Sequence, residues 1–273
     1  MRLSHVIAAL DELYPPAWAE SWDAVGPVCG DPGQEVGRVL FAVDPVAAVL
    51  DEALEWGADL LVTHHPLLLR GVHSVAATTP KGRMVHRMIR EGVALYTAHT
   101  NADRADPGVS DALARAVGLT GALRPMVPDG DDPRRGLGRV GDLAEPVTLA
   151  EFTRGAAAGL PSTAWGVRAA GDPGRAVRTV AVCGGAGDSL LDTARAAGAD
   201  VYLTADLRHH PASEFTEQGG PALVDAAHWA TEWPWLADAE RRLTGASKEA
   251  GTLETRVSTL VTDAWSLHFE GAQ

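Results

Sequence analysis

Two adjacent histidines are the residues of this sequence that most clearly suggest chemistry. His64 and His65 follow the apolar run Leu60-Leu61-Val62 within the segment LVTHHPLLLRG. A continuous apolar run is typical of a parallel strand that is covered on both faces. Two imidazoles at its end would lie at the carboxyl edge of a sheet, where open α/β sheets place their sites. The pair alone is compatible with metal binding, with catalysis, or with a loop that happens to hold two histidines.

The elements that must position these histidines occur twice in the chain. The segment VLFAVDP…EALEWGADLLVTHHP corresponds to TVAVCGGAG…DTARAAGADVYLTADLRHHP, and each contains a strand, a helix, Gly-Ala-Asp and a second strand. The units that follow, GVALYTAHTNAD and GPALVDAAHWATE, align His99 with His228 and Asp103 with Glu232. We therefore expect an α/β protein with two similar lobes and right-handed βαβ connections. The predicted lobes span residues 1–125 and 126–273, with a metal site at the strand ends between them.

The repeat gathers imidazoles and carboxylates at strand ends. They are His64, His65, His99 and Asp103 in the first half, and Asp206, His210, His228 and Glu232 in the second. Several imidazoles with carboxylates suit Zn, Mn, Fe or Co better than a metal that prefers thiolates. A bridging carboxylate can hold two ions roughly 3.5–4 Å apart, as in two-metal hydrolases. For Glu232, the alternative is a carboxylate that only stabilises a helix N-terminus.

Composition narrows the class of protein. The chain has 273 residues, 46% of them hydrophobic, and a formal net charge of −13. This acidity makes a broad nucleic-acid surface improbable and favours binding of a cation. Two cysteines far apart, Cys29 and Cys183, indicate neither a disulfide framework nor a zinc-type spacing. We see no signal peptide and no membrane span, so we expect a cytoplasmic protein.

Other motifs are weaker. The glycines of GLGRVGDL match the GxGxxG spacing, but no good strand precedes them, so a strand pair or tight turn is the better interpretation. Cys183, before a run of glycines, could be a nucleophile, although a small buried cysteine is more common. Trp22 and Asp23 could reach the site or could simply pack. The indoles between Trp229 and Trp235 more plausibly pack a lobe or subunit contact than stack on a substrate ring.

Several motifs in the same order resemble the NIF-three-like family, also known as GTP cyclohydrolase type-2 homologues or dinuclear-metal-centre proteins. They run nearly end to end: AESWDAVGPVCG, VDPVAAVLDEALEWGADLLVTHHPLLL, YTAHTNAD, GLGRVGDL, VAVCGGAG, GADVYLTADLRHH and DAAHWATE. The resemblance implies an α/β fold of two similar lobes and a toroidal homohexamer. Three positions depart from the family pattern, namely Ala24, Ala205 and Ala227, and they bear on the substrate pocket more than on the metals.

Carried onto the matching positions, the resemblance implies two divalent ions per chain. The implied ligands are His64, His65, Asp103, His228 and Glu232, with His99 in or beside the metal shell. His99 and Asp206 are the candidates for proton transfer.

We therefore expect a metal-dependent hydrolase of a nucleotide-like or phosphorylated small molecule, with GTP ring opening as one special case. The alternative is a protein without turnover: a metal carrier, a sensor or a regulatory interaction protein.

Overall fold

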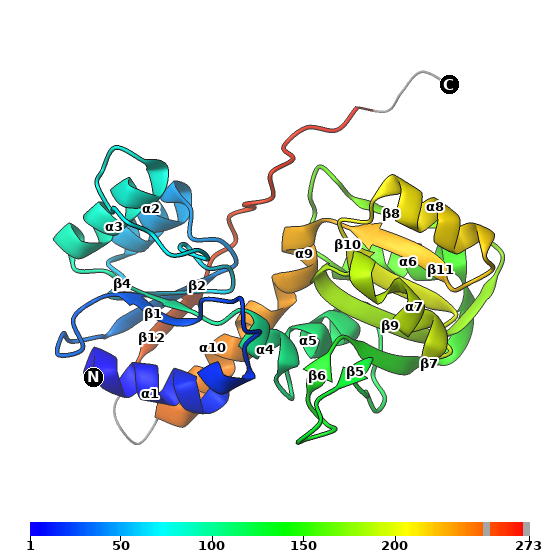
Figure 1. Cartoon of the computed structure of the whole chain (residues 1–273), viewed down its shortest axis with the longest axis horizontal. Helices are drawn as coiled ribbons and strands as arrows, with labels where there is room; N and C mark the ends of the chain where they lie inside the picture. The colour runs from blue at the N-terminus through cyan, green and yellow to red at the C-terminus, as the bar shows by residue number, and fades with distance from the viewer. Residues whose placement is uncertain (248–251, 270–273) are drawn as a thin grey trace. The chain divides into compact units, whose positions relative to one another are not determined.

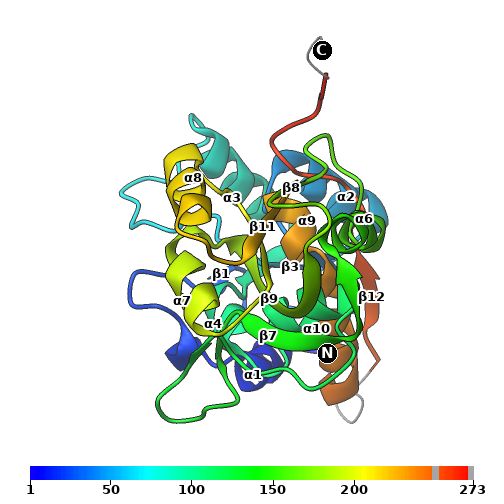
Figure 2. The same ribbon diagram turned by 90° about the vertical axis from the view of Figure 1, so that its right-hand side faces the viewer.

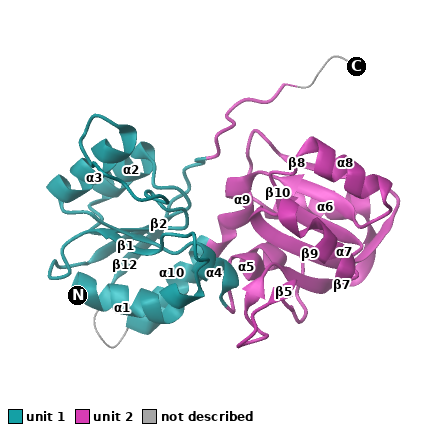
Figure 3. Cartoon of the chain, viewed as in Figure 1, with its two compact units in different colours: residues 1–105, 236–262 teal, residues 106–235, 263–273 magenta. Residues whose placement is uncertain are grey.

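The chain folds into two compact units that interleave along the sequence. The structure, a computed structural model, describes residues 1–247 and 252–269 (Figure 1). Unit 1 comprises residues 1–105 and 236–262, and unit 2 comprises residues 106–235 and 263–273 (Figure 3). The internal repeat of the sequence predicts a single boundary near residue 125. The structure differs because a helix and a strand from the end of the chain complete unit 1.

Unit 1 is built on a five-stranded sheet with the order β1-β4-β3-β2-β12. Strands β2, β3, β4 and β12 are parallel, and β1 pairs antiparallel with β4 at the edge. The late strand β12 adds to β2, which explains why residues near the C-terminus belong to the first unit. The strands are β1 (Gly26–Cys29), β2 (Arg38–Ala42), β3 (Leu60–Thr63), β4 (Ala94–Thr97) and β12 (Glu254–Val257).

Helices cover both faces of this sheet. Figure 1 shows α2 and α3 on one face and α1 and α10 on the other. Met84, Val85 and Met88 of α3 pack into the core between the helices and the sheet. Ile89 of the same helix lies outside this core and is 63% exposed. The helices are α1 (Leu3–Leu13), η1 (Pro16–Trp18), α2 (Ala47–Trp56), α3 (Pro80–Glu91), α4 (Thr100–Arg104) and α10 (Pro234–Ser247).

Unit 2 is also built on a five-stranded sheet, with the order β7-β9-β10-β11-β8. Its three central strands are parallel, and both edge strands run antiparallel to them. Of the glycines of GLGRVGDL, Gly136 lies in β6, Gly141 lies in β7 and Gly138 lies between them. The two strands pair with β5 and β9 respectively and not with each other. The strands are β5 (Val127–Pro128), β6 (Gly136–Leu137), β7 (Arg139–Thr148), β8 (Val167–Ala170), β9 (Ala176–Ala186), β10 (Val201–Ala205) and β11 (Ala222–Ala226).

Two separate cores lie on the two faces of the second sheet. Figure 2 shows α7 and α8 on one face and α6 on the other. Alternate residues of the strands serve the two cores: Val201 and Leu203 face the core with α6, whereas Tyr202 faces the core with α7 and α8. The helices are α5 (Val109–Ala116), α6 (Leu149–Gly159), η2 (Asp188–Leu190), α7 (Leu191–Ala196), α8 (His209–Glu217) and α9 (His228–Glu232).

The topology of the two sheets confirms the internal repeat. The parallel run β2-β3-β4 matches β9-β10-β11, and each run carries an antiparallel strand beside its last member. The aspartates of the two Gly-Ala-Asp motifs make equivalent hydrogen bonds in the two lobes. Asp59 accepts hydrogen bonds from the backbone N–H groups of Gly37 and Arg38, at 2.8 and 2.9 Å. Asp200 accepts from Arg178 and Thr179, at 2.9 and 2.8 Å.

These aspartates give each lobe a fixed start for its central strand. Each carboxylate accepts hydrogen bonds from two backbone N–H groups of the neighbouring strand, immediately before the residues that pair with the central strand. These contacts set the register between the two strands.

Among the described residues, no helix is both long and apolar enough to cross a membrane.

Replacing Asp200 by alanine should destabilise the protein, because two backbone donors lose a charged acceptor. We expect the free energy of unfolding, measured by urea denaturation, to fall by about 1.5–3 kcal/mol. The matched control is Asp192→Ala, whose side chain is 88% exposed in an ion pair with Arg195. It should change the free energy of unfolding by less than about 1 kcal/mol. Equal losses in the two variants would contradict a structural role for Asp200.

Candidate metal centre

Three histidines of unit 1 converge at the carboxyl ends of β3 and β4. His64 and His65 follow β3 directly, and His99 lies just beyond β4, at the start of α4. Their candidate ligand nitrogens all lie within 4.8 Å of one another. The centroids of the His64 and His99 rings are 5.1 Å apart. Two parallel neighbouring strands therefore bring together residues that are more than thirty positions apart in sequence.

Each of these imidazoles is held by an acceptor on its Nδ1 side. The pairs are His64 with the carbonyl of Ala98 at 2.9 Å, His65 with Asp44 at 2.7 Å, and His99 with Asp23 at 2.9 Å. A carbonyl or carboxylate oxygen can only accept, so Nδ1 donates and the lone pair of the neutral ring lies on Nε2. Histidines that bind metals are oriented in this way by a partner on the other ring nitrogen.

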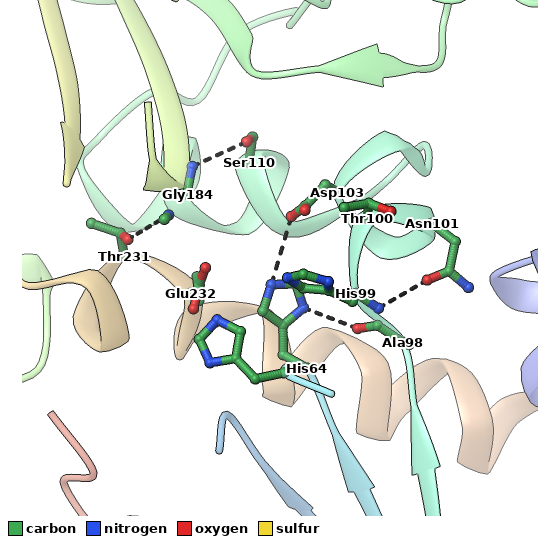
Figure 4. Close-up of polar contacts among 12 residues, drawn as sticks. His64, Ala98, His99, Thr100, Asn101, Asp103, Ser110, Gly184, Thr231 and Glu232 are labelled. Carbon is green, nitrogen blue, oxygen red and sulfur yellow. Dashed lines mark hydrogen bonds and ion pairs between the residues drawn. The ribbon is translucent and has the colours of Figure 1, made fainter. Parts of the chain in front are cut away.

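Asp103 adds a carboxylate to this cluster. It lies in the first turn of the short helix α4, where a negative charge is favoured. Its Oδ1 is 3.8 Å from Nε2 of the buried His64. Figure 4 shows His64 with Ala98 on one side of its ring and Asp103 on the other. The same ring thus faces an orienting acceptor with one nitrogen and a carboxylate with the other.

Unit 2 carries a second set of donors at the corresponding place in its own sheet. His228 and Glu232 begin and end α9, directly after β11, and Nε2 of His228 is 3.0 Å from Oε1 of Glu232. The Nδ1 atom of His228 is 2.7 Å from Asp206, at the end of β10. The pattern of unit 1 is repeated: an acceptor on a neighbouring strand orients the ring, and Nε2 faces a carboxylate.

Charge explains the protonation of His228. The carboxylate of Glu232 raises the pKa of His228 to about 11, and the hydrogen bond to Asp206 adds to this effect against the opposing influence of burial. The ring is therefore cationic at neutral pH when no metal is bound. Its Nε2 proton is shared with Glu232, whose Oε1 lies 3.0 Å away. A metal ion that binds there must displace this proton.

The backbone of unit 2 approaches this pair closely. Gly185, near the end of β9, has a φ of +67°, and a Cβ built there would lie 2.5 Å from Oε1 of Glu232 and 3.1 Å from Nε2 of His228. Its N–H donates to Oγ1 of Thr231 at 2.9 Å, and that hydroxyl donates to the carbonyl of His228 at 2.7 Å. Gly185 is therefore a glycine for reasons of both space and backbone conformation. The run of glycines after Cys183 packs against the ligand pair.

The two lobes differ at the position of the histidine pair. Strand β3 ends in Thr63 followed by His64 and His65, whereas the aligned end of β10 is Thr204, Ala205 and Asp206. Asp206 has a left-handed φ of 57°, a conformation that aspartate tolerates better than most residues. Its carboxylate orients His228, so we interpret Asp206 as a positioning residue. His210, also gathered by the repeat, lies at the exposed start of α8 beside His209.

The sequence patterns leave two of the orienting residues unassigned. No motif singles out Asp44, and Asp23 is compatible both with a role in the site and with packing. Asp44 holds His65 and also accepts from the hydroxyl of Thr262 at 2.5 Å. The sequence does contain a signal that could have identified Asp44. It follows the strand that neighbours the strand before His64 and His65, and parallel neighbouring strands end at the same edge of a sheet.

Asp23 is fixed as an anion. Burial acts to raise the pKa of its carboxyl group, but hydrogen bonds from His99 and from Thr100 outweigh this effect and hold the pKa well below its usual range. A carboxyl group whose pKa is lower in the folded state stabilises the protein above its unfolded pKa. That stabilisation is lost as the pH falls through the folded pKa.

Asp23→Asn should therefore destabilise the protein in a pH-dependent way. We expect a loss of about 1.5–3 kcal/mol in the free energy of unfolding near neutral pH, where hydrogen bonds to a charged group are broken. The difference from the wild type should shrink as the pH falls below the ordinary carboxyl pKa of 3.8. Asp51→Asn, at a 63% exposed carboxylate paired with Arg87, is the control and should show a much smaller loss. A loss for Asp23→Asn that stays constant down to about pH 2 would contradict this assignment.

Known proteins resemble this chain over nearly its whole length. A model of the family Duf34/NIF3 (NGG1p interacting factor 3) matches residues 1–264. A Streptomyces coelicolor protein named GTP cyclohydrolase 1 type 2 homolog is 60% identical, over 99% of this chain and 96% of that protein. A Mycobacterium tuberculosis protein of the same name is 40% identical, over 99% of this chain and 98% of its own length.

Solved structures show the same fold. A hypothetical protein of Staphylococcus aureus superimposes with a TM-score of 0.89 at 27% identity, over 97% of this chain and 99% of that one. A Bacillus cereus protein related to NIF3 gives a TM-score of 0.89 at 22% identity, over 97% and 98% of the two chains. Since the family match runs over nearly the whole sequence and the α/β fold agrees, the chain belongs to the Duf34/NIF3 family.

Proposed function

We propose that the chain binds up to two divalent metal ions and uses them to hydrolyse a nucleotide-like or phosphorylated small molecule. The assigned ligands are His64, His65, Asp103, His228 and Glu232. One shared feature of the histidines carries the proposal: every strand-end imidazole of the two donor sets hydrogen-bonds through Nδ1 to an acceptor. Such an arrangement is expected of metal ligands and is unnecessary for surface histidines.

The types of donor also support a metal centre. Imidazole nitrogens and carboxylate oxygens suit Zn, Mn, Fe or Co. The assigned ligands lie on corresponding short helices and strand ends of the two units, as the internal repeat predicts. Bound ions of this kind lower the pKa of a coordinated water and so supply a nucleophile near neutral pH.

Two further side chains have assigned roles beside the ligands. His99, whose Nδ1 donates to Asp23, is the candidate for proton transfer, because this hydrogen bond fixes the tautomer and leaves Nε2 as the acceptor nitrogen of the ring. Asp206 holds His228 and keeps its ring in place. The name of the Streptomyces and Mycobacterium relatives makes the ring opening of GTP one special case of the proposed hydrolysis.

Metal content tests the ligand set directly. Glu232→Gln keeps the shape of the side chain but removes its charge, and it should lower metal affinity by well over tenfold. Asp44→Asn, which weakens the support of His65, should lower it by about 10–100-fold. His86→Ala, at an exposed histidine of α3, is the control and should retain wild-type loading. Metal is measured by inductively coupled plasma mass spectrometry after dialysis against buffered Zn²⁺ or Mn²⁺. Equal loading of the Glu232 and His86 variants would overturn the assignment.

Turnover needs a separate experiment. The wild type, loaded with each metal in turn, is assayed against a panel of nucleotides and phosphoesters beside a His64→Ala, Glu232→Ala double variant. We expect hydrolysis of at least one class of compound by the wild type and a loss of at least about 10²-fold in the double variant, because the nucleophile depends on the metals. Equal background rates, together with normal metal binding by the wild type, would contradict the hydrolase and favour a metal carrier, sensor or interaction protein.

We also propose that the chain forms a homo-oligomer, which the family resemblance implies to be a hexamer. Light scattering in solution measures its mass.

A further inference from the structure

An exposed indole lies beside the histidine cluster of unit 1. Trp22 belongs to the turn between η1 and β1, and its side chain is 58% exposed. Its ring meets that of His99 edge to face, with centroids 6.1 Å apart and an interplanar angle of 79°. His99 in turn lies within 5.1 Å of His64 and 5.6 Å of His65, measured between ring centroids. A single imidazole thus connects the exposed indole to the other two rings of the cluster.

The turn that carries Trp22 is fixed on both sides of the indole. Before it, the N–H of Glu20 donates to Oγ1 of Thr100 at 2.9 Å, and the Glu20 carboxylate pairs with Arg104 at 2.5 Å. After it, the Asp23 carboxylate accepts from the Thr100 N–H at 3.0 Å and from its hydroxyl at 2.5 Å. The N–H of Asp23 closes the turn on the carbonyl of Glu20 at 3.0 Å.

This fixation distinguishes Trp22 from an ordinary exposed apolar residue. Large apolar side chains exposed one at a time are common on protein surfaces and need no explanation. Trp265, for example, is 62% exposed in the segment beyond β12, where its ring centroid lies 6.0 Å from that of Trp165. The turn of Trp22, however, is held by the same aspartate that orients His99. Asp23 therefore positions both the backbone of the Trp22 turn and the imidazole of His99. This edge of the cluster is largely pre-organised for a ligand.

We propose that Trp22 is the residue that binds a flat aromatic ring of the substrate by stacking, beside the metal ligands. This inference rests on the proposed metal-dependent function and adds a substrate class to it. Indole faces stack on heteroaromatic rings such as nucleobases, largely regardless of the substituents of the ring. Stacked aromatic rings keep their centroids about 4.5–7 Å apart. A substrate ring stacked on Trp22 would therefore lie against an indole that itself contacts His99. A phosphorylated molecule without such a ring would lack this contact.

Two probes isolate the contribution of the ring. Guanosine monophosphate and ribose 5-phosphate share the sugar and the phosphate, and only the first carries a base. Their dissociation constants are measured by isothermal titration calorimetry on the full chain loaded with Zn²⁺. We expect guanosine monophosphate to bind at least about tenfold more tightly than ribose 5-phosphate, the effect of one stacked base.

Variants of Trp22 then assign the preference to the indole. Trp22→Ala should reduce the ratio of the two dissociation constants to about threefold or less, while Trp22→Phe, which keeps a flat ring, should retain most of it. Trp265→Ala is the matched control for removal of an exposed indole and should leave the ratio unchanged. Zinc content, measured on every variant, should stay at the wild-type level. A ratio near one in the wild type, or an unchanged ratio in Trp22→Ala, would overturn the proposal.

Chelation separates this inference from the proposed function. If the metals hold the phosphate, removal of Zn²⁺ with EDTA should weaken the binding of both probes to the same extent. The ratio of their dissociation constants should then stay unchanged. Normal zinc content with no preference for the base would reject the stacking role alone. A preference for the base that depends on Trp22, in a chain whose Glu232→Gln variant loads zinc normally, would reject the assigned metal ligands and keep the ring site.

Discussion

The candidate centre depends on acceptors that hold the Nδ1 atoms of histidines at strand ends. An imidazole on a flexible side chain can present either nitrogen, and only one that is oriented can bind metal without a large loss of conformational entropy. His65 is oriented by Asp44 of the neighbouring strand end, and in the other lobe His228 is oriented by Asp206, which also lies at the end of a neighbouring strand. His64 uses a backbone carbonyl instead. These contacts exist only because parallel strands end at one edge and bring their last residues together.

The same constraint explains how one repeated unit can hold two different donor sets. Both lobes keep the aspartate of Gly-Ala-Asp, which joins the central strand to its neighbour, and both keep a histidine and a carboxylate on the short helix after the third parallel strand. The lobes diverge where the central strand ends. In the first lobe this place carries the pair His64 and His65, and in the second it carries Asp206, which orients the candidate ligand His228.

The backbone around His228 shows a second kind of constraint. Gly185 comes so close to Glu232 and His228 that a Cβ would collide with the carboxylate. Thr231 ties this backbone to the start of α9 through its hydroxyl group. The Cys183 motif, considered as a possible nucleophile site, therefore has a packing role in the described structure. The glycines that follow the cysteine allow β9 to pass beside the ligand pair.

Sequence alone determined the fold class and the duplication. The apolar run before His64, the repeated Gly-Ala-Asp motif and the paired HxxxD and HxxxE segments were sufficient for the α/β class and the two similar lobes, because each is a local pattern or an internal similarity. The same patterns singled out the candidate donor residues. Tertiary structure alone decided the supporting contacts and the division of the chain. Asp23 and Asp44 meet His99 and His65 across long stretches of sequence, and β12 joins β2 from the far end of the chain. Such pairings depend on which strands become neighbours in the sheet, and local sequence patterns do not specify the order of the strands.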